Sequence, residues 1–184
     1  MRLVLASASP RRKELLARLV PQFEVEPSRF EEVGAGLSAC ETARAFAVGK
    51  AREVAARRPQ DAVLGSDTVV SLDGKILGKP KDEGDARRML HLLSGRTHTV
   101  YTGVCLIAGG KEFVDVVHAD VTFEALTDEV VAAYVATGKP LDKAGAYGIQ
   151  DGFPLVRSYR GSFSCIMGLP LERLSGMLRE AGLI

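Results

Sequence analysis

Arg11, Arg12 and Lys13 form a run of cations directly after Ser9 and a proline, at the start of a segment with helical periodicity. Serine followed by proline is a strong helix-start signal, with Ser9 as the cap. The amino end of a helix dipole is positive, so each cation there costs about 0.3–1 kcal/mol. A bound anion would remove this conflict, and small residues such as Ser7 would let it approach the backbone. The segment predicts an anion site; the alternative is a solvated basic helix end.

Asp67 interrupts a stretch, residues 63–70, that otherwise reads as a buried strand. Burying an unpaired carboxylate costs several kcal/mol, so Asp67 should have a cation or a metal ion as a partner. In a phosphate site such a carboxylate can hold a divalent metal or activate a water molecule. The alternative is an acid at a strand end or bulge, paired with a nearby basic group.

Two lysines are further candidates for phosphate binding. Lys50 falls on the apolar stripe of a helix predicted over 38–56, where it either meets a counter-ion or extends to the surface. Lys79, in the run GKPK, could hold phosphate as a point charge. The run is not a Walker A loop, because the spacing from Gly74 is one residue short and Pro80 replaces the serine or threonine.

The segment DKAGAYGIQ at 142–150 combines small residues with two polar side chains. Its glycines allow close backbone approach to a ligand, Tyr147 offers a ring face or hydroxyl, and Gln150 offers an amide that could read a base edge. The alternative is a set of glycine turns beside a strand.

These side chains must be positioned by alternating helices and strands. Helices are predicted over 9–19, 38–56, 82–93, 127–136 and 169–178. Strands are predicted over 2–5, 23–26, 62–72, 75–77, 97–108, 112–126 and 153–159, with a loop over 28–36 and a loop-rich stretch over 137–152. Because hairpins and helical crossovers both occur, the pattern favours an α/β fold with a mixed sheet flanked by helices.

Composition narrows the function classes. The chain has 184 residues, 46% of them apolar, and a formal net charge of +1, which fits one domain over 1–184 and gives no case for nucleic-acid partners. No apolar window is long enough to span a bilayer, and the start lacks a secretion signal. The three scattered cysteines indicate reduced thiols, and the three histidines lack metal or triad spacing. We expect a cytoplasmic protein without membrane partners.

Taken together, the segments resemble the Maf family of nucleoside triphosphate pyrophosphatases. The matching segments, in chain order, are LASASPRR at 5–12, EE at 31–32, KA at 50–51, GSDTVV at 65–70, LGKPKD at 77–82, LSGRTHTVYTGV at 93–104, DKAGAYGIQ at 142–150 and GLPL at 168–171. They span essentially the whole chain in register, which makes the resemblance specific.

The resemblance implies an elongated, two-lobed Maf/ITPase-like fold with a central cleft, in which a twisted mixed sheet is flanked by helices. It also implies hydrolysis between the α- and β-phosphates of a nucleoside triphosphate, dependent on a divalent metal cation (Mg or Mn). By motif position, Asp67 is the catalytic general base and, with Glu32, a metal ligand. The substrate-binding positions match Ser7, Arg12, Lys50 and Lys79, and the base-selecting positions match Arg11, Thr68 and Gln150.

The unbroken DKAGAYGIQ, with Thr68 after the aspartate, resembles family members that act on dTTP and UTP; modified pyrimidine nucleotides are further candidate substrates. The alternatives are the same chemistry on 7-methyl-GTP, and a non-catalytic nucleotide-binding regulator of cell division. The resemblance is compatible with a homodimer. This chain carries Cys165 where the family usually has asparagine.

Overall fold

The protein is built on a seven-stranded mixed sheet, seen in a computed structural model that describes residues 1–34 and 36–184. The strands are β1 (Leu3–Leu5), β2 (Glu24–Val25), β3 (Ala62–Leu72), β4 (Lys75–Leu77), β5 (Thr97–Ala108), β6 (Lys111–Phe123) and β7 (Val156–Gly161). Their order is β2-β1-β3-β5-β6-β7, and β4 pairs with β3 off this path. β1 is parallel to β2 and β3, and the other pairs are antiparallel.

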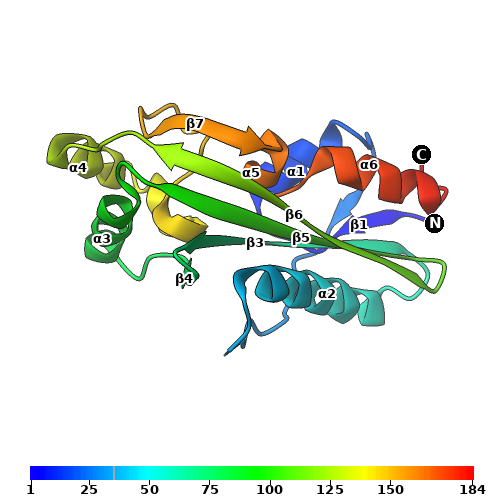
Figure 1. The fold of residues 1–184 in the computed structure, drawn as a ribbon. Helices are drawn as coiled ribbons and strands as arrows, with labels where there is room; N and C mark the ends of the chain where they lie inside the picture. The colour runs from blue at the N-terminus through cyan, green and yellow to red at the C-terminus, as the bar shows by residue number, and fades with distance from the viewer. Residues whose placement is uncertain (35) are drawn as a thin grey trace.

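Helices cover both faces of the sheet (Figure 1). They are α1 (Pro10–Ala17), α2 (Ala39–Arg57), α3 (Glu83–Leu93), α4 (Asp128–Ala136), α5 (Phe163–Met167) and α6 (Leu171–Glu180). In Figure 1, α2 lies below the long strands β3, β5 and β6, whereas α1, α5 and α6 lie above them. The predicted fold class, a mixed sheet flanked by helices, is confirmed.

The helix starts follow the local signals in the sequence. Ser9 caps α1 by accepting a hydrogen bond from the Arg12 amide, and Ser38 and Glu41 form a complete capping box on α2. Asp82 and Thr127 cap α3 and α4 in the same way. These four starts were predicted.

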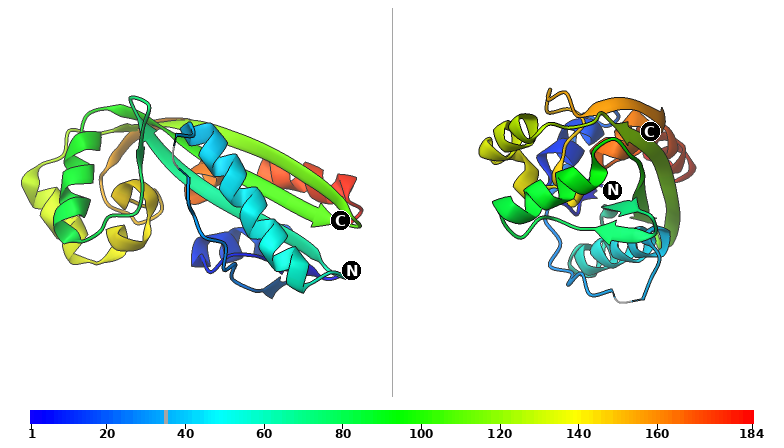
Figure 2. Two further views of the ribbon diagram at one scale, coloured as in Figure 1. Left: turned by 90° about the horizontal axis from the view of Figure 1, so that it is seen from below. Right: turned by 60° about the vertical axis from the view of Figure 1, so that its left-hand side comes forward.

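Helices cover the sheet at both ends of the long strands (Figure 2). Apolar side chains form a cluster at each of these ends. At one end, α3, α4 and two short 3-10 turns, η1 (Lys139–Asp142) and η2 (Ala144–Ala146), pack on the sheet around Leu90, Phe123 and Tyr134. At the other end, α1 and α6 pack around Leu15, Leu106 and Leu174. The turns η1 and η2 lie in the stretch predicted to be loop-rich.

Several predicted boundaries were wrong. β7 begins at Val156 instead of 153, since Pro154 has no N–H to donate to a neighbouring strand. β6 ends at Phe123, where the register with β7 becomes irregular. The helix α5 was not predicted, because five residues are too few to show a helical period. The loop predicted over 28–36 includes Ala35, which lies outside the described residues.

Two glycines let α2 lie directly against the sheet. A Cβ atom on Gly103 of β5 would come within 2.2 Å of the Ala43 carbonyl oxygen, and one on Gly65 of β3 within 2.4 Å of the Ala47 carbonyl oxygen. Both contacts are with helix backbone, which cannot move aside as a side chain can. The absence of side chains at these positions therefore sets the distance between α2 and strands β3 and β5.

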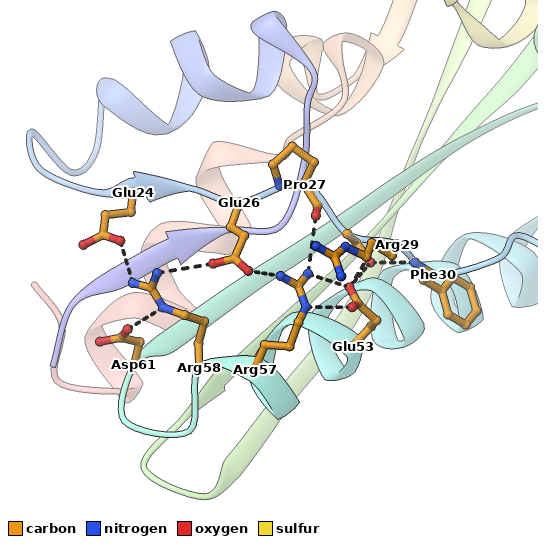
Figure 3. A network of polar contacts seen from close by, with 10 residues as sticks. Glu24, Glu26, Pro27, Arg29, Phe30, Glu53, Arg57, Arg58 and Asp61 are labelled. Atoms are coloured by element: carbon orange, nitrogen blue, oxygen red, sulfur yellow. Dashed lines mark hydrogen bonds and ion pairs between the residues drawn. The ribbon is translucent and has the colours of Figure 1, made fainter.

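An ion-pair network ties the carboxyl end of α2 to the segment that follows β2 (Figure 3). Arg57 and Arg58 both pair with Glu26, and Arg58 also bonds Asp61 at 2.8 Å. Glu53 of α2 accepts a hydrogen bond of 2.9 Å from the Arg29 amide. The network anchors the chain just before residues 31 and 32 alongside α2.

Candidate active site

The cleft opens where one edge of β3 has no partner strand. On one edge, β3 pairs with β5 through residues 63–71. On the other edge, β1 pairs with residues 62–64 and β4 with residues 70–72, which leaves residues 65–69 without a strand partner there among the described residues. A cleft of about 620 Å³ lies at this gap, between the end of β1 and the end of β4. Neighbouring residues of β3 point to opposite faces of the sheet.

The structure brings all the candidate site residues to the wall of this cleft. They are Ser7, Arg11, Arg12, Glu32, Lys50, Asp67, Thr68, Lys79 and Gln150. They come from α1, α2, β3 and the loops after β1, β2, β4 and η2. None of the three histidines lies on the cleft wall.

Asp67 and Glu32 converge on the ammonium group of Lys50. Lys50 Nζ lies 2.7 Å from Asp67 Oδ1 and 2.6 Å from Glu32 Oε1. Asp67 is only 7% exposed, and burial raises the pKa of its carboxyl group, whereas the Lys50 charge acts to lower that pKa. Of the two alternatives for Lys50, the counter-ion is the one observed.

This pair of carboxylates fits a divalent cation. Both acids already share a cationic partner, and Mg²⁺ in phosphate sites is typically held by one or two carboxylates, substrate phosphates and water. Among the described residues, no group of three or more His, Cys, Asp or Glu could hold a metal by itself. Asp67 and Glu32 could therefore hold a metal only together with ligands from a bound nucleotide or water.

Three hydrogen bonds hold the guanidinium of Arg12 at the start of α1. Its Nε donates to the Gly168 carbonyl at 2.8 Å, Nη2 donates to Thr68 Oγ1 at 3.0 Å, and Nη1 donates to Ser7 Oγ at 3.4 Å. Burial lowers the pKa of Arg12, so its charged form lacks full solvation. Ser7 Oγ also accepts from the Ser9 amide at 3.2 Å, which leaves its own hydrogen free to be donated.

Arg11 and Lys79 face the cleft from opposite sides of the β3 gap. Arg11 Nη1 lies 3.5 Å from Asp142 Oδ2 of η1. Lys79 is exposed in the loop after β4, where the carbonyl of Gly78 accepts a hydrogen bond of 3.1 Å from the Gly145 amide. Gln150 is exposed at the end of the same 142–150 segment. The segment therefore contacts both the α1 side and the β4 side of the cleft.

Tyr147 lines the cleft, but its hydroxyl is already in use. Tyr147 Oη and His98 Nε2 share a buried hydrogen bond of 2.6 Å. The predicted use of this hydroxyl toward a ligand is therefore not supported, whereas the ring remains part of the wall. Within the same 142–150 segment, the buried Lys143 places its Nζ 3.4 Å from Asp151 Oδ2, which ties the segment to the residue that follows it.

Sequence reasoning missed three groups that contact the site residues. Ser66 Oγ lies 3.0 Å from the carbonyl oxygens of both Gly168 and Gly103, and Thr102 Oγ1 lies 3.0 Å from Thr68 Oγ1. A hydroxyl residue inside an otherwise apolar strand was the available signal at Ser66 and Thr102. At Gly168 the signal was a glycine within the GLPL match, but its carbonyl partners are not visible in the sequence.

Within the described residues, the helices are all too short or too polar to cross a membrane.

Comparison with known proteins assigns the chain to a family. The family model described as "Maf-like protein" matches residues 2–181.

Curated relatives align over nearly the whole chain. A dTTP/UTP pyrophosphatase of Thermococcus gammatolerans is 51% identical over 98% of this chain and 96% of its own length. A dTTP/UTP pyrophosphatase of Moorella thermoacetica is 50% identical over 98% of this chain and 95% of its own length. Another, from Koribacter versatilis, is 47% identical over 100% of this chain and 96% of its own length. With a family model over almost its full length and relatives of this similarity, the chain belongs to the Maf-like protein family.

Proposed function

We propose that this protein is a nucleotide diphosphatase that hydrolyses dTTP and UTP between the α- and β-phosphates, giving the monophosphate and pyrophosphate. The names and high identity of the curated relatives support this activity. The observation that carries it is the buried Asp67, bonded to Lys50 within the cleft that also presents Arg12. A carboxylate (Asp67), two cations (Lys50 and Arg12) and the amino end of α1 lie in one cleft. This combination suits the hydrolysis of a phosphoanhydride bond.

In the proposed complex, the triphosphate lies at the amino end of α1. Arg12 is held in place by Gly168, Thr68 and Ser7, so little side-chain entropy is lost when it binds a phosphate. Ser7 donates its hydroxyl hydrogen to a phosphate oxygen. Lys79 and Lys50 offset the remaining negative charge.

Asp67 is the proposed general base. Its carboxylate removes a proton from the water that attacks phosphorus, and the pKa raised by burial makes it a stronger base than an exposed aspartate. Asp67 and Glu32 are also the proposed ligands of a divalent cation, Mg²⁺ or Mn²⁺, which would supply charge neutralisation to the phosphates. Lys50 keeps the two acids close together when no other cation lies between them.

Base selection is proposed to involve Arg11, Thr68 and Gln150. Uracil and thymine present carbonyl oxygens that a guanidinium or an amide N–H can bind. Arg11 is oriented by Asp142, and Gln150 lies on the cleft wall.

We further propose that residues 1–184 form one domain of two lobes around the cleft. The three free cysteines and the nucleotide substrate support action in the cytoplasm.

The direct test is the variant Asp67→Asn, assayed for pyrophosphate and orthophosphate separately with dTTP and UTP. Loss of a general base should reduce kcat by about 100-fold or more. The melting temperature should hold or rise, because a buried charge is removed while Lys50 keeps Glu32. Asp115→Asn is the matched control, since Asp115 pairs with Arg173 at 2.6 Å away from the cleft.

Three outcomes would contradict the proposal. Near-normal turnover by Asp67→Asn would remove Asp67 from the chemistry. Orthophosphate as the first product would exclude α–β cleavage. Tight nucleotide binding by the wild-type protein without any hydrolysis, with Mg²⁺ or Mn²⁺ present, would favour a regulator. A panel that includes 7-methyl-GTP, CTP and modified pyrimidine nucleotides defines the base preference.

A further inference from the structure

A chain of hydrogen bonds runs from Arg12 into the core, and its direction is determined by the chemistry of its two ends. Arg12 Nη2 lies 3.0 Å from Thr68 Oγ1, and a guanidinium can only donate. Thr102 Oγ1 lies 2.8 Å from the carbonyl oxygen of Cys165, which can only accept. The single hydrogen of Thr102 is therefore used on Cys165, and the 3.0 Å contact between the two threonines requires Thr68 to donate.

This direction determines what Thr68 can do. Its hydrogen is committed to Thr102, and one lone pair is committed to Arg12, so toward the cleft it can only accept. A phosphate oxygen also only accepts in this setting. Thr68 thus has no direct bond to offer to phosphate, and its effect on phosphate binding runs through Arg12.

This series of hydrogen bonds ends at the Cys165 carbonyl of α5. A second set of hydrogen bonds ends at Gly168, directly after the same helix. The Gly168 carbonyl accepts from Arg12 Nε at 2.8 Å, and Ser66 Oγ lies 3.0 Å from both the Gly168 and the Gly103 carbonyl oxygens. The thiol of Cys165, whose pKa burial raises to about 11, donates to the Val117 carbonyl at 3.2 Å and so attaches α5 to β6. Two carbonyl groups, that of Cys165 in α5 and that of Gly168 directly after it, therefore support Arg12: Gly168 directly, and Cys165 through the two threonines.

We propose that Thr102, together with the carboxyl end of α5, positions Arg12 for phosphate binding. Thr102 is fully buried, lies opposite Thr68 in the β3–β5 register and does not line the cleft. It is a positioning residue that acts only through Thr68. The inference rests on the proposed function to the extent that the ligand of Arg12 is a polyphosphate.

The test compares Thr102→Val with Thr102→Ser. Valine keeps the shape but removes the hydroxyl, so Thr68 loses its acceptor and its oxygen is no longer fixed toward Arg12. We expect KM for dTTP to rise about 10-fold, as for one hydrogen bond to a charged group, with kcat changed less than about 3-fold. Serine restores the hydroxyl and should return KM to within about 2-fold of the wild-type value, since only a methyl group is lost.

Thr99→Val is the matched control on the same strand. It removes a 2.8 Å hydrogen bond to Asp120 outside the cleft, and KM should not change. Titration with inorganic triphosphate gives a readout without hydrolysis, and its Kd should follow the same order. If the wild-type protein binds triphosphate but hydrolyses no nucleotide, the proposed function fails while the positioning role is still tested by Kd.

A second variant covers the case in which Thr102→Val does not fold. A Cβ on Gly168 would lie 3.3 Å from both Arg12 Nε and Thr68 Oγ1, at a positive φ of 116°. Gly168→Ala should therefore weaken triphosphate binding, whereas Gly182→Ala, at a positive φ of 68° with open space around it, should not. Unchanged Kd in both threonine and glycine variants, or failure of Thr102→Ser to restore binding, would overturn the proposal.

Discussion

At the scale of single residues, the site depends on charged side chains that lie in direct contact, two of them largely buried. Lys50 is the clearest case, because one ammonium contacts two carboxylates within 2.7 Å. Removing Lys50 would leave the buried Asp67 carboxylate without its cation, which is costly, whereas removing one acid leaves Lys50 with the other.

His98 should make folding stability depend on pH. Burial lowers its pKa to about 4 from 6.5, so the unfolded chain binds a proton over this interval and the folded protein does not. Stability should therefore fall as the pH drops from about 6.5 toward 4, by up to about 3 kcal/mol, and the effect should vanish above 6.5. Urea denaturation at pH 7 and 4.5 measures this difference.

The matching variant is His98→Gln, which keeps a polar partner for Tyr147 but does not titrate. Its stability loss between the two pH values should be smaller than that of the wild-type protein. His118→Gln, on the exposed face of β6, should behave like the wild type. An identical pH dependence in His98→Gln would show that His98 is not responsible.

At the scale of elements, the distance between α2 and the sheet decides whether Lys50 can reach Asp67. Gly65 and Asp67 point to the α2 face of β3, whereas Ser66 and Thr68 point to the α5 face. On one face, β3 thus places Asp67, the proposed base, against Lys50 of α2. On the other face, it places Thr68 against Arg12 of α1. The alternation of side chains along β3 produces both halves of the site.

Gly103→Ala tests this arrangement. The new methyl group would meet the Ala43 carbonyl at 2.2 Å, so α2 must move away from the sheet. We expect a loss of about 2 kcal/mol or more in the free energy of unfolding, and a fall in kcat as Lys50 leaves Asp67. Thermal melts and steady-state kinetics measure the two effects.

Gly176→Ala is the control for a glycine-to-alanine change. Gly176 lies within α6, and its Cβ would meet only the guanidinium end of Arg173. Alanine there should be neutral or stabilising by up to about 1 kcal/mol. Full stability and activity in Gly103→Ala would contradict the role given to the close α2 contact.

At the scale of the whole molecule, the cleft lies between the apolar clusters at the two ends of the long strands. The α1 end carries Arg12, and the other end carries the 142–150 segment with Gln150. Arg11 and Asp142 already form a contact of 3.5 Å between these ends. A nucleotide with phosphates at one end and its base at the other would add many more contacts between them.

A non-hydrolysable UTP analogue should therefore stabilise both ends together. At a free concentration of 100 times its Kd, a ligand raises the free energy of unfolding by about 2.7 kcal/mol. For a chain of this size, that corresponds to a rise of roughly 5–10 °C in Tm. Hydrogen exchange should slow in residues 7–12 and in residues 142–150. Inorganic triphosphate, the matched ligand without a base, should protect only the first segment; protection confined to that segment with the UTP analogue would contradict the proposed pose.

The sequence by itself determined the features that depend on neighbouring residues. These include the caps of α1 to α4, the hairpin at Asp73 and Gly74, the long strands and the cation run at the start of α1. The family motifs added the site residues, all of which lie on one cleft. Local propensity and motif matching succeed here because each signal lies within a few residues of its effect.

Only the tertiary structure decided how these residues are held. The partner of Lys50, the loss of the Tyr147 hydroxyl to His98 and the support of Arg12 by Gly168, which is 156 residues away, depend on contacts between distant segments. The short helix α5 has too few residues for a periodic signal, yet its carbonyl groups set the position of Arg12. The charges at the start of α1 thus predict an anion site, but the geometry of this segment is created by strands and a helix that fold against it.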